Sequence, residues 1–198
     1  MGLFDFFKRN NKSKTEVVKA SKPSPEHILF ADTVLEIITP TVEKFGFIRH
    51  RTEIEEHFTT IIFRKDKQYI KISGTTYATD YPYCYNIVLG EGDSEDFYEW
   101  DWNSIALWRL KTKIDPKAKA KEFEFPYGDK VKYSIANADK ELFKYADTFL
   151  RGDMILFYET RSEQNKNREP YKIYTPSKDG SYKTTDELNS VEQKKKYS

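Results

Sequence analysis

Side chains capable of acid–base chemistry are concentrated between residues 50 and 57. Glu53, Glu55 and His57 alternate along the chain, so in an extended strand they would share one face. A carboxylate beside a histidine could transfer protons. We favour the alternative of a charged edge strand, because charged residues commonly protect such edges. His50 would lie on the other side of that strand from His57, so the pair does not predict a zinc site.

The single cysteine, Cys84, lies among tyrosines in a predicted strand. No basic neighbour is evident that would lower its pKa, so we predict a buried structural thiol rather than a nucleophile. One cysteine also favours a reducing compartment, and we expect a cytoplasmic protein. The sequence shows no phosphate-binding loop, no dinucleotide fingerprint and no nucleophile elbow. We therefore predict no catalytic residue, no cofactor and no metal site.

The segment EGDSEDFYEWDW, residues 91–102, combines six acids with four aromatic residues and contains no base. Aromatic side chains supply much of the binding energy at interfaces, while negative charge steers a basic partner. The alternative is a solvated loop whose aromatic rings fold into the core. The predicted partner-binding residues are Asp93, Glu95, Asp96, Phe97, Tyr98, Trp100 and Trp102.

The N-terminal segment MGLFDFFKRN is amphipathic on a helical wheel. Two helical turns are not stable alone in water, so this segment needs a surface on which to fold. Docking on the parent domain or on a partner is one interpretation, and weak contact with a membrane surface is the other. The residues predicted to make this contact are Leu3, Phe4, Phe6 and Phe7.

Helical spacing of apolar residues predicts two main helices. Ser24 can cap the first helix, Pro25 suits its first turn and Gly46 can end it. Pro40 should kink or divide this helix, because a proline inside a helix removes a hydrogen bond. The two helices are predicted at about residues 25–45 and 138–151.

Three stretches between these helices, HFTTIIFRKD, KQYIKISG and YCYNIVLGEG, are rich in β-branched and aromatic residues. They predict antiparallel strands. The apolar residues of DWNSIALWRLK fit neither the helical nor the strand spacing cleanly, and we favour a strand. Gly152 can end the second helix, the apolar run MILFYETR should follow as helix, and PYKIYTPSKDGSYKT should form a hairpin. The fold class is therefore α+β, with an antiparallel sheet of about four to six strands packed with the two helices.

The length of 198 residues suits one domain. We expect an amphipathic segment at 1–9, a linker at 10–24, a single α+β domain at 25–175 and a basic flexible tail at 176–198. Residues 26–163 contain 19 basic and 25 acidic residues, so the body is acidic between basic ends. This distribution does not predict nucleic-acid binding. The basic run at 109–121 is expected to be solvated.

Several stretches resemble uncharacterised bacterial α+β domains, some of which are associated with toxin–immunity systems. They are MGLFDFFKRN, the helix ending in EKFGF before a run of strands, and NIVLGEG followed by DWNSIALWRL. The resemblance implies a non-enzymatic binding protein, and within that class an immunity-type inhibitor of a basic toxin. An enzyme of unrecognised class and a peripheral membrane adaptor that uses the N-terminal helix are the alternatives. The sequence leaves the oligomeric state open.

Overall fold

The computed structural model describes residues 22–92, 102–177 and 180–198. The strands are β1 (Ile48–Ile54), β2 (Phe58–Lys65), β3 (Gln68–Thr75), β4 (Cys84–Glu91), β5 (Ser104–Ala106), β6 (Phe123–Glu124), β7 (Lys172–Pro176) and β8 (Tyr182–Asp186). The helices are α1 (Pro25–Ile37), α2 (Thr39–Glu43), α3 (Leu107–Ile114), α4 (Lys130–Arg151), α5 (Ile155–Lys166) and α6 (Leu188–Tyr197), with a 3₁₀ turn η1 (Ala78–Asp80).

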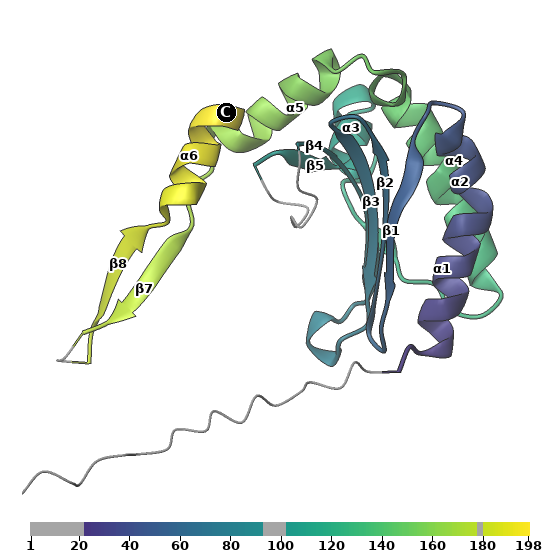
Figure 1. The fold of residues 1–198 in the computed structure, drawn as a ribbon, viewed down its shortest axis with the longest axis horizontal. Coiled ribbons are helices and arrows are strands. Elements are labelled where there is room, and N and C mark those ends of the chain that lie inside the picture. Colours follow the sequence, from purple (N-terminus) through teal and green to yellow (C-terminus); the bar gives the residue numbers. More distant parts are fainter. Residues whose placement is uncertain (1–21, 93–101, 178–179) are drawn as a thin grey trace, which may run out of the picture.

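The main sheet has six strands, of which five follow one another in the order β1-β2-β3-β4-β5 while β6 pairs with β4. All of these pairs are antiparallel. Figure 1 shows α1, α2 and α4 covering one face of this sheet. The α+β class and the antiparallel sheet predicted from the sequence are therefore confirmed.

Alternation along the central strands separates an apolar face from a polar one. Ile61, Ile72 and Ile87 lie opposite one another and are fully buried in the core beneath the helices. Their sequence neighbours therefore point to the other face, because successive strand residues face opposite sides. Aromatic rings fill the remaining core, and the ring of Phe30 stacks on that of Phe125 with centroids 5.0 Å apart.

The first predicted helix is divided as the proline indicates. Ser24 accepts a hydrogen bond of 3.3 Å from the backbone N–H of His27 and so caps α1. Pro40 lies in the first turn of α2, where a missing N–H costs least. Gly46 has a φ of 86°, which suits the turn into β1.

The second predicted helix starts earlier than expected, because α4 begins at Lys130 rather than near residue 138. Val131 and Ile135 extend its buried face. β-branched residues have a lower helix propensity, which weakened the helical signal in these first turns. Gly152, with a φ of 91°, ends α4 as predicted, and the next apolar run is helical as expected, forming the separate helix α5.

The stretch predicted as a strand at DWNSIALWRLK is a strand only over the three residues of β5. From Leu107 the chain forms α3, so the prediction is wrong for this second half. Leu107 and Leu110 are buried three residues apart, which is a helical spacing, and α3 packs on α4. The three residues of β5 are too few to show the alternation of buried and exposed residues that distinguishes a strand from a helix.

The C-terminal region also differs from the expected flexible tail, because the structure has β8 and α6 there. Ser190 in α6 is buried, and its hydroxyl accepts hydrogen bonds from Trp102 Nε1 at 3.1 Å and from the backbone N–H of Tyr171 at 3.0 Å. Asn165 Nδ2 donates to the carbonyl of Tyr197 at 3.0 Å. These long-range contacts hold α6 against α5 and against Trp102, which precedes β5, and local sequence patterns do not reveal them.

Candidate binding groove

A groove of about 630 Å³ is lined by side chains of β2, β3 and β4, among them Thr60, Ser73 and Asn86. These three are the sequence neighbours of the core-facing Ile61, Ile72 and Ile87, so the groove lies on the face of the main sheet opposite the helices. We call it the sheet groove. Its size is in the range of ligand-binding pockets in proteins. It is lined by Phe58, Thr59, Thr60, Lys71, Ser73, Gly74, Thr75, Tyr77, Asp80, Pro82, Cys84, Tyr85, Asn86 and Glu122.

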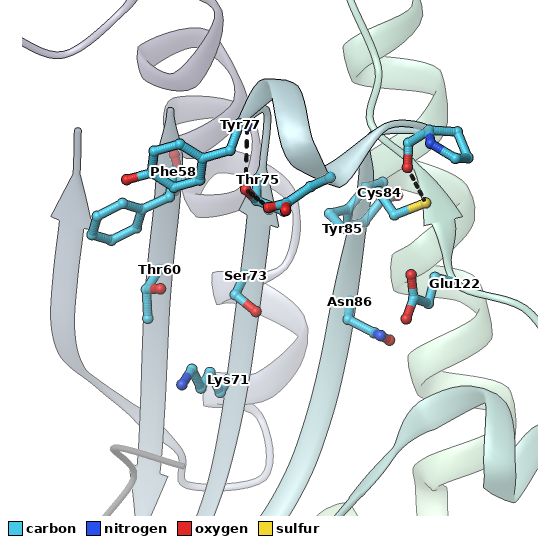
Figure 2. Close-up of a pocket in the computed structure, with 14 residues that line it drawn as sticks. Phe58, Thr60, Lys71, Ser73, Thr75, Tyr77, Cys84, Tyr85, Asn86 and Glu122 are labelled. Atoms are coloured by element: carbon cyan, nitrogen blue, oxygen red, sulfur yellow. Dashed lines mark hydrogen bonds between the residues drawn. The ribbon is translucent and has the colours of Figure 1, made fainter. Parts of the chain in front are cut away.

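The floor of the sheet groove is a row of polar side chains on three neighbouring strands. Thr60 pairs directly with Ser73, and Ser73 pairs directly with Asn86. Figure 2 shows these three side chains on the same side of the sheet, with Lys71 nearby. Neighbouring strands lie about 4.8 Å apart, so the row places hydroxyl and amide groups at a regular spacing, with Thr60 and Asn86 only 8% and 6% exposed. Each of these groups can both donate and accept hydrogen bonds.

Two aromatic residues, Phe58 and Tyr77, lie at the end of the sheet groove near η1. Tyr77 and Phe58 lie together at one corner (Figure 2), and the ring of Tyr77 is 5.2 Å from that of His57. Tyr81 is 78% exposed and makes an edge contact with Tyr83 at 5.5 Å. We call Tyr77, Tyr81 and Tyr83, which flank η1, the tyrosine rim. Tyr77 lines the sheet groove, whereas Tyr83 packs against the core on the helix side of the sheet.

Hydrogen bonds hold the turn that carries the tyrosine rim. The Thr75 hydroxyl donates to Asp80 Oδ2 at 2.8 Å, and the Thr79 hydroxyl donates to Asp80 Oδ1 at 3.1 Å. One carboxylate therefore ties both sides of η1 to the end of β3, and the tyrosines that flank η1 have a fixed base.

Cys84 lies in the wall of the sheet groove, between Pro82 and Glu122. Its thiol donates to the carbonyl of Pro82 at 3.3 Å. Partial burial raises the pKa of this thiol, and the negative charge of Glu122 raises it further. Cys84 is therefore protonated near neutral pH, as expected for a thiol that is not a nucleophile. It is only half-buried, however, and not enclosed in the core as predicted.

The histidines and carboxylates between residues 50 and 57 do not share one strand. β1 ends at Ile54, so Glu55 and His57 lie in the connection to β2 while Glu53 stays in β1. Glu53 lies 3.6 Å from Arg51, and His57 lies 3.8 Å from Glu56. The predicted common face of Glu53, Glu55 and His57 is wrong, because the strand turns before it reaches them. The position of β1 at an end of the strand order agrees with the predicted edge strand.

Two kinds of feature are absent from the described residues 22–92, 102–177 and 180–198. Within them, no three His, Cys, Asp or Glu side chains gather as ligands of a metal ion would. In the same ranges, no helix combines the length and the apolar character needed to cross a bilayer.

Most of the site residues predicted from the sequence lie outside the described residues. Trp102 is described and fully buried, with its indole N–H bonded to Ser190, so its ring packs between α6 and the segment that precedes β5. At the other end of the acidic segment, Glu91 accepts from Tyr158 Oη at 2.8 Å and from Arg161 at 3.1 Å. The residues outside the described ranges are Asp93, Glu95, Asp96, Phe97, Tyr98, Trp100, Leu3, Phe4, Phe6 and Phe7.

The basic run at 109–121 includes side chains held in ion pairs. Lys111 Nζ lies 2.7 Å from Glu141, Lys113 pairs with Glu163, and the Arg109 guanidinium lies 4.5 Å from the centre of the Trp108 ring. These contacts join α3 to α4 and α5, so part of this charge serves packing between helices.

Sequence reasoning missed the sheet groove. The polar row appears only when three strands are aligned in register, which no local pattern gives. The tyrosine rim left a visible signal, because YATDYPYCY contains four tyrosines in nine residues. Comparison with protein-family models, with curated proteins and with solved structures found no match.

Proposed function

We propose that this chain is a non-enzymatic binding protein that holds a segment of a partner protein in the sheet groove. The observation that carries the proposal is the polar row of Thr60, Ser73 and Asn86 on the groove floor, with Tyr77 at the corner of the groove (Figure 2). Exposed tyrosines supply contact area with little loss of conformational entropy, which is why they are common at binding surfaces. A row that donates and accepts at strand spacing suits the amide groups of an extended polypeptide.

The charge near the groove wall favours basic side chains on that partner. Glu122 lies in the wall, Glu124 follows in β6, and both raise the pKa of the Cys84 thiol through their negative charge. A negative potential of this kind attracts lysine or arginine and speeds encounter. Lys71 and Lys121 also line this region, so the preference would be local to the wall.

The finer role that we propose is that of an immunity-type inhibitor of a basic toxin. Proteins that cleave nucleic acid carry positive charge to bind their substrate, and an acidic body is suited to mask them. In this role the chain would cover the basic surface of the toxin in the cell that makes both proteins. Co-expression with the captured partner tests it, since the chain should restore growth that the partner alone arrests.

The binding proposal is tested by filling the groove. Ser73→Trp should place an indole over the polar row, while Ser162→Trp places the same side chain at an exposed position of α5. Capture from the source cells, followed by quantitative mass spectrometry, should identify a partner that the Ser162→Trp control retains and Ser73→Trp loses by about tenfold or more. Equal retention of every captured protein by both variants would refute the groove as the binding site. Circular dichroism checks that both variants fold.

An enzyme that uses Cys84 as a nucleophile is the first alternative. The raised pKa of this thiol opposes it, because the thiolate is the reactive species. Alkylation by iodoacetamide at neutral pH should therefore be slower than for a free cysteine. The second alternative, a membrane adaptor, predicts liposome binding that disappears when residues 1–9 are deleted.

A further inference from the structure

The hairpin of β7 and β8 forms a second sheet of only two strands. Figure 1 shows it standing apart from the main sheet, beyond α5 and α6. Every residue of both strands is exposed, including Ile173 at 49%, Tyr174 at 65% and Tyr182 at 68%. A single two-stranded hairpin is at best marginally stable in water, so this element would gain from further strands.

Two backbone hydrogen bonds fix which groups of the hairpin point outward. The N–H of Glu187 donates to the carbonyl of Tyr171 at 2.8 Å, and the N–H of Ser177 donates to the carbonyl of Ser181 at 2.8 Å. Hydrogen-bonded and non-bonded pairs alternate along an antiparallel ladder. The register between these two bonds therefore leaves six residues with backbone groups directed away from the partner strand, namely Lys172, Tyr174 and Pro176 on β7 and Tyr182, Thr184 and Asp186 on β8.

The two edges of the hairpin differ in their capacity to pair. On β7 one of the outward positions is Pro176, which has no N–H to donate. Proline at such a position is a common means of blocking an edge. On β8 all three outward residues have both an N–H and a carbonyl. The outer edge of β8 is therefore the one that can accept another strand over its whole length.

We propose that two copies of this chain pair through β8, antiparallel and around a twofold axis at Thr184. In this register Thr184 faces Thr184 of the second copy, and Tyr182 faces Asp186 of the second copy. All three pairs use the outward backbone groups, so each exchanges two hydrogen bonds. The product is a four-stranded sheet, with the two β7 strands and their Pro176 residues at its outer edges.

The sequence of β8 is the reason for choosing a second copy over another partner. The twofold arrangement puts no like charges directly opposite each other, since Lys183 faces Thr185 and Tyr182 faces Asp186. Threonine pairs across strands are favourable, and the Tyr182 phenol can donate to the carboxylate of Asp186. A twofold interface requires a surface complementary to itself, and this strand satisfies that requirement.

Sedimentation velocity over a range of concentrations tests the pairing. Thr184→Pro removes an outward N–H of β8 and leaves the β7–β8 hydrogen bonds intact, so it should weaken the dimer by about tenfold or more. Tyr174→Pro makes the same change at the outward edge of β7 and should leave the dimer unchanged. A wild-type chain that stays monomeric throughout, or a Thr184→Pro variant that dimerises like the wild type, overturns the proposal.

A cross-link provides an independent readout that does not depend on proline. In a Cys84→Ser background, Thr184→Cys should form a disulfide-linked dimer on mild oxidation, because paired Cα atoms about 5.5 Å apart suit a disulfide. Lys183→Cys is the matched control, since its side chain faces the other side of the sheet and lies opposite Thr185. Equal rates of cross-linking for the two variants would also overturn the pairing.

Discussion

His27 should make the stability of this fold depend on pH. Its side chain is fully buried, and its ring nitrogens lie 2.8 Å from Thr59 Oγ1 and 3.0 Å from Thr76 Oγ1. Burial lowers the pKa of His27, the charge of His57 lowers it further, and Glu26 acts in the opposite direction. The ring is therefore neutral in the folded protein near neutral pH.

The folded protein disfavours protonation of His27, and this decides whether stability rises or falls with pH. In the unfolded chain a histidine titrates near pH 6.5. Above that pH both states hold a neutral ring, so His27 adds no pH dependence. Below it the unfolded state binds a proton that the folded state does not, so stability falls as the pH drops toward the pKa of the folded state. For one proton the free energy of unfolding can fall by at most about 1.4 kcal/mol per pH unit.

Urea unfolding, followed by tryptophan fluorescence at pH 7.5, 6.5 and 5.5, measures this dependence. His27→Gln keeps a polar group at the site but cannot titrate, and at pH 7.5 it should cost about 1–3 kcal/mol through imperfect hydrogen bonding. The difference in free energy of unfolding between wild type and His27→Gln should then be smaller by about 1 kcal/mol at pH 5.5 than at pH 7.5. A gap that stays constant or widens would refute the reasoning, as would an NMR titration that gives a folded pKa above 6.5.

Three further predictions concern packing and binding. Gly90→Ala should lower the free energy of unfolding, measured in urea, by roughly 1–3 kcal/mol, because a Cβ there would lie 2.0 Å from Cζ of the buried Tyr69. Tyr69→Leu should restore part of this loss in the Gly90→Ala chain. Unchanged stability of Gly90→Ala would contradict the clash. Ser190→Ala should lower the free energy of unfolding by about 1–3 kcal/mol, because it leaves the Trp102 indole N–H unpaired. Amide hydrogen exchange should then become faster in α6 but not in β3. Equal protection of α6 in the variant and the wild type would argue against this role. If the acidic segment contacts a basic partner, capture should weaken while the fold survives after reversal of three charges, those of Asp93, Glu95 and Asp96.

The main elements of this fold could be predicted because their signals are local. The capping serine, the proline that divides the first helix and the β-branched runs of the central strands each report on a few neighbouring residues. Element boundaries were less accurate where β-branched residues begin a helix, as in the first turns of α4, or where a three-residue strand leads directly into a helix, as at Ala106.

The sheet groove and the docking of α6 could not be predicted, because both depend on contacts across the chain. The polar row needs the register of three strands, and the alternation of a single strand shows only that some face is polar. The docking of α6 rests on single polar contacts, such as that of Asn165 Nδ2 with the carbonyl of Tyr197 at 3.0 Å. Such contacts leave no periodic pattern, so a Lys-rich C-terminal region is expected to be a flexible tail.

The hydrogen bond between Trp102 and Ser190 joins residues that are 88 positions apart. A protein is synthesised from its N-terminus, so β5 leaves the ribosome long before α6 does. During that interval Trp102 is without the helix that covers it. Nascent chains halted before Leu188 should therefore expose this indole to chaperones, and α6 completes the burial of a side chain from the middle of the fold.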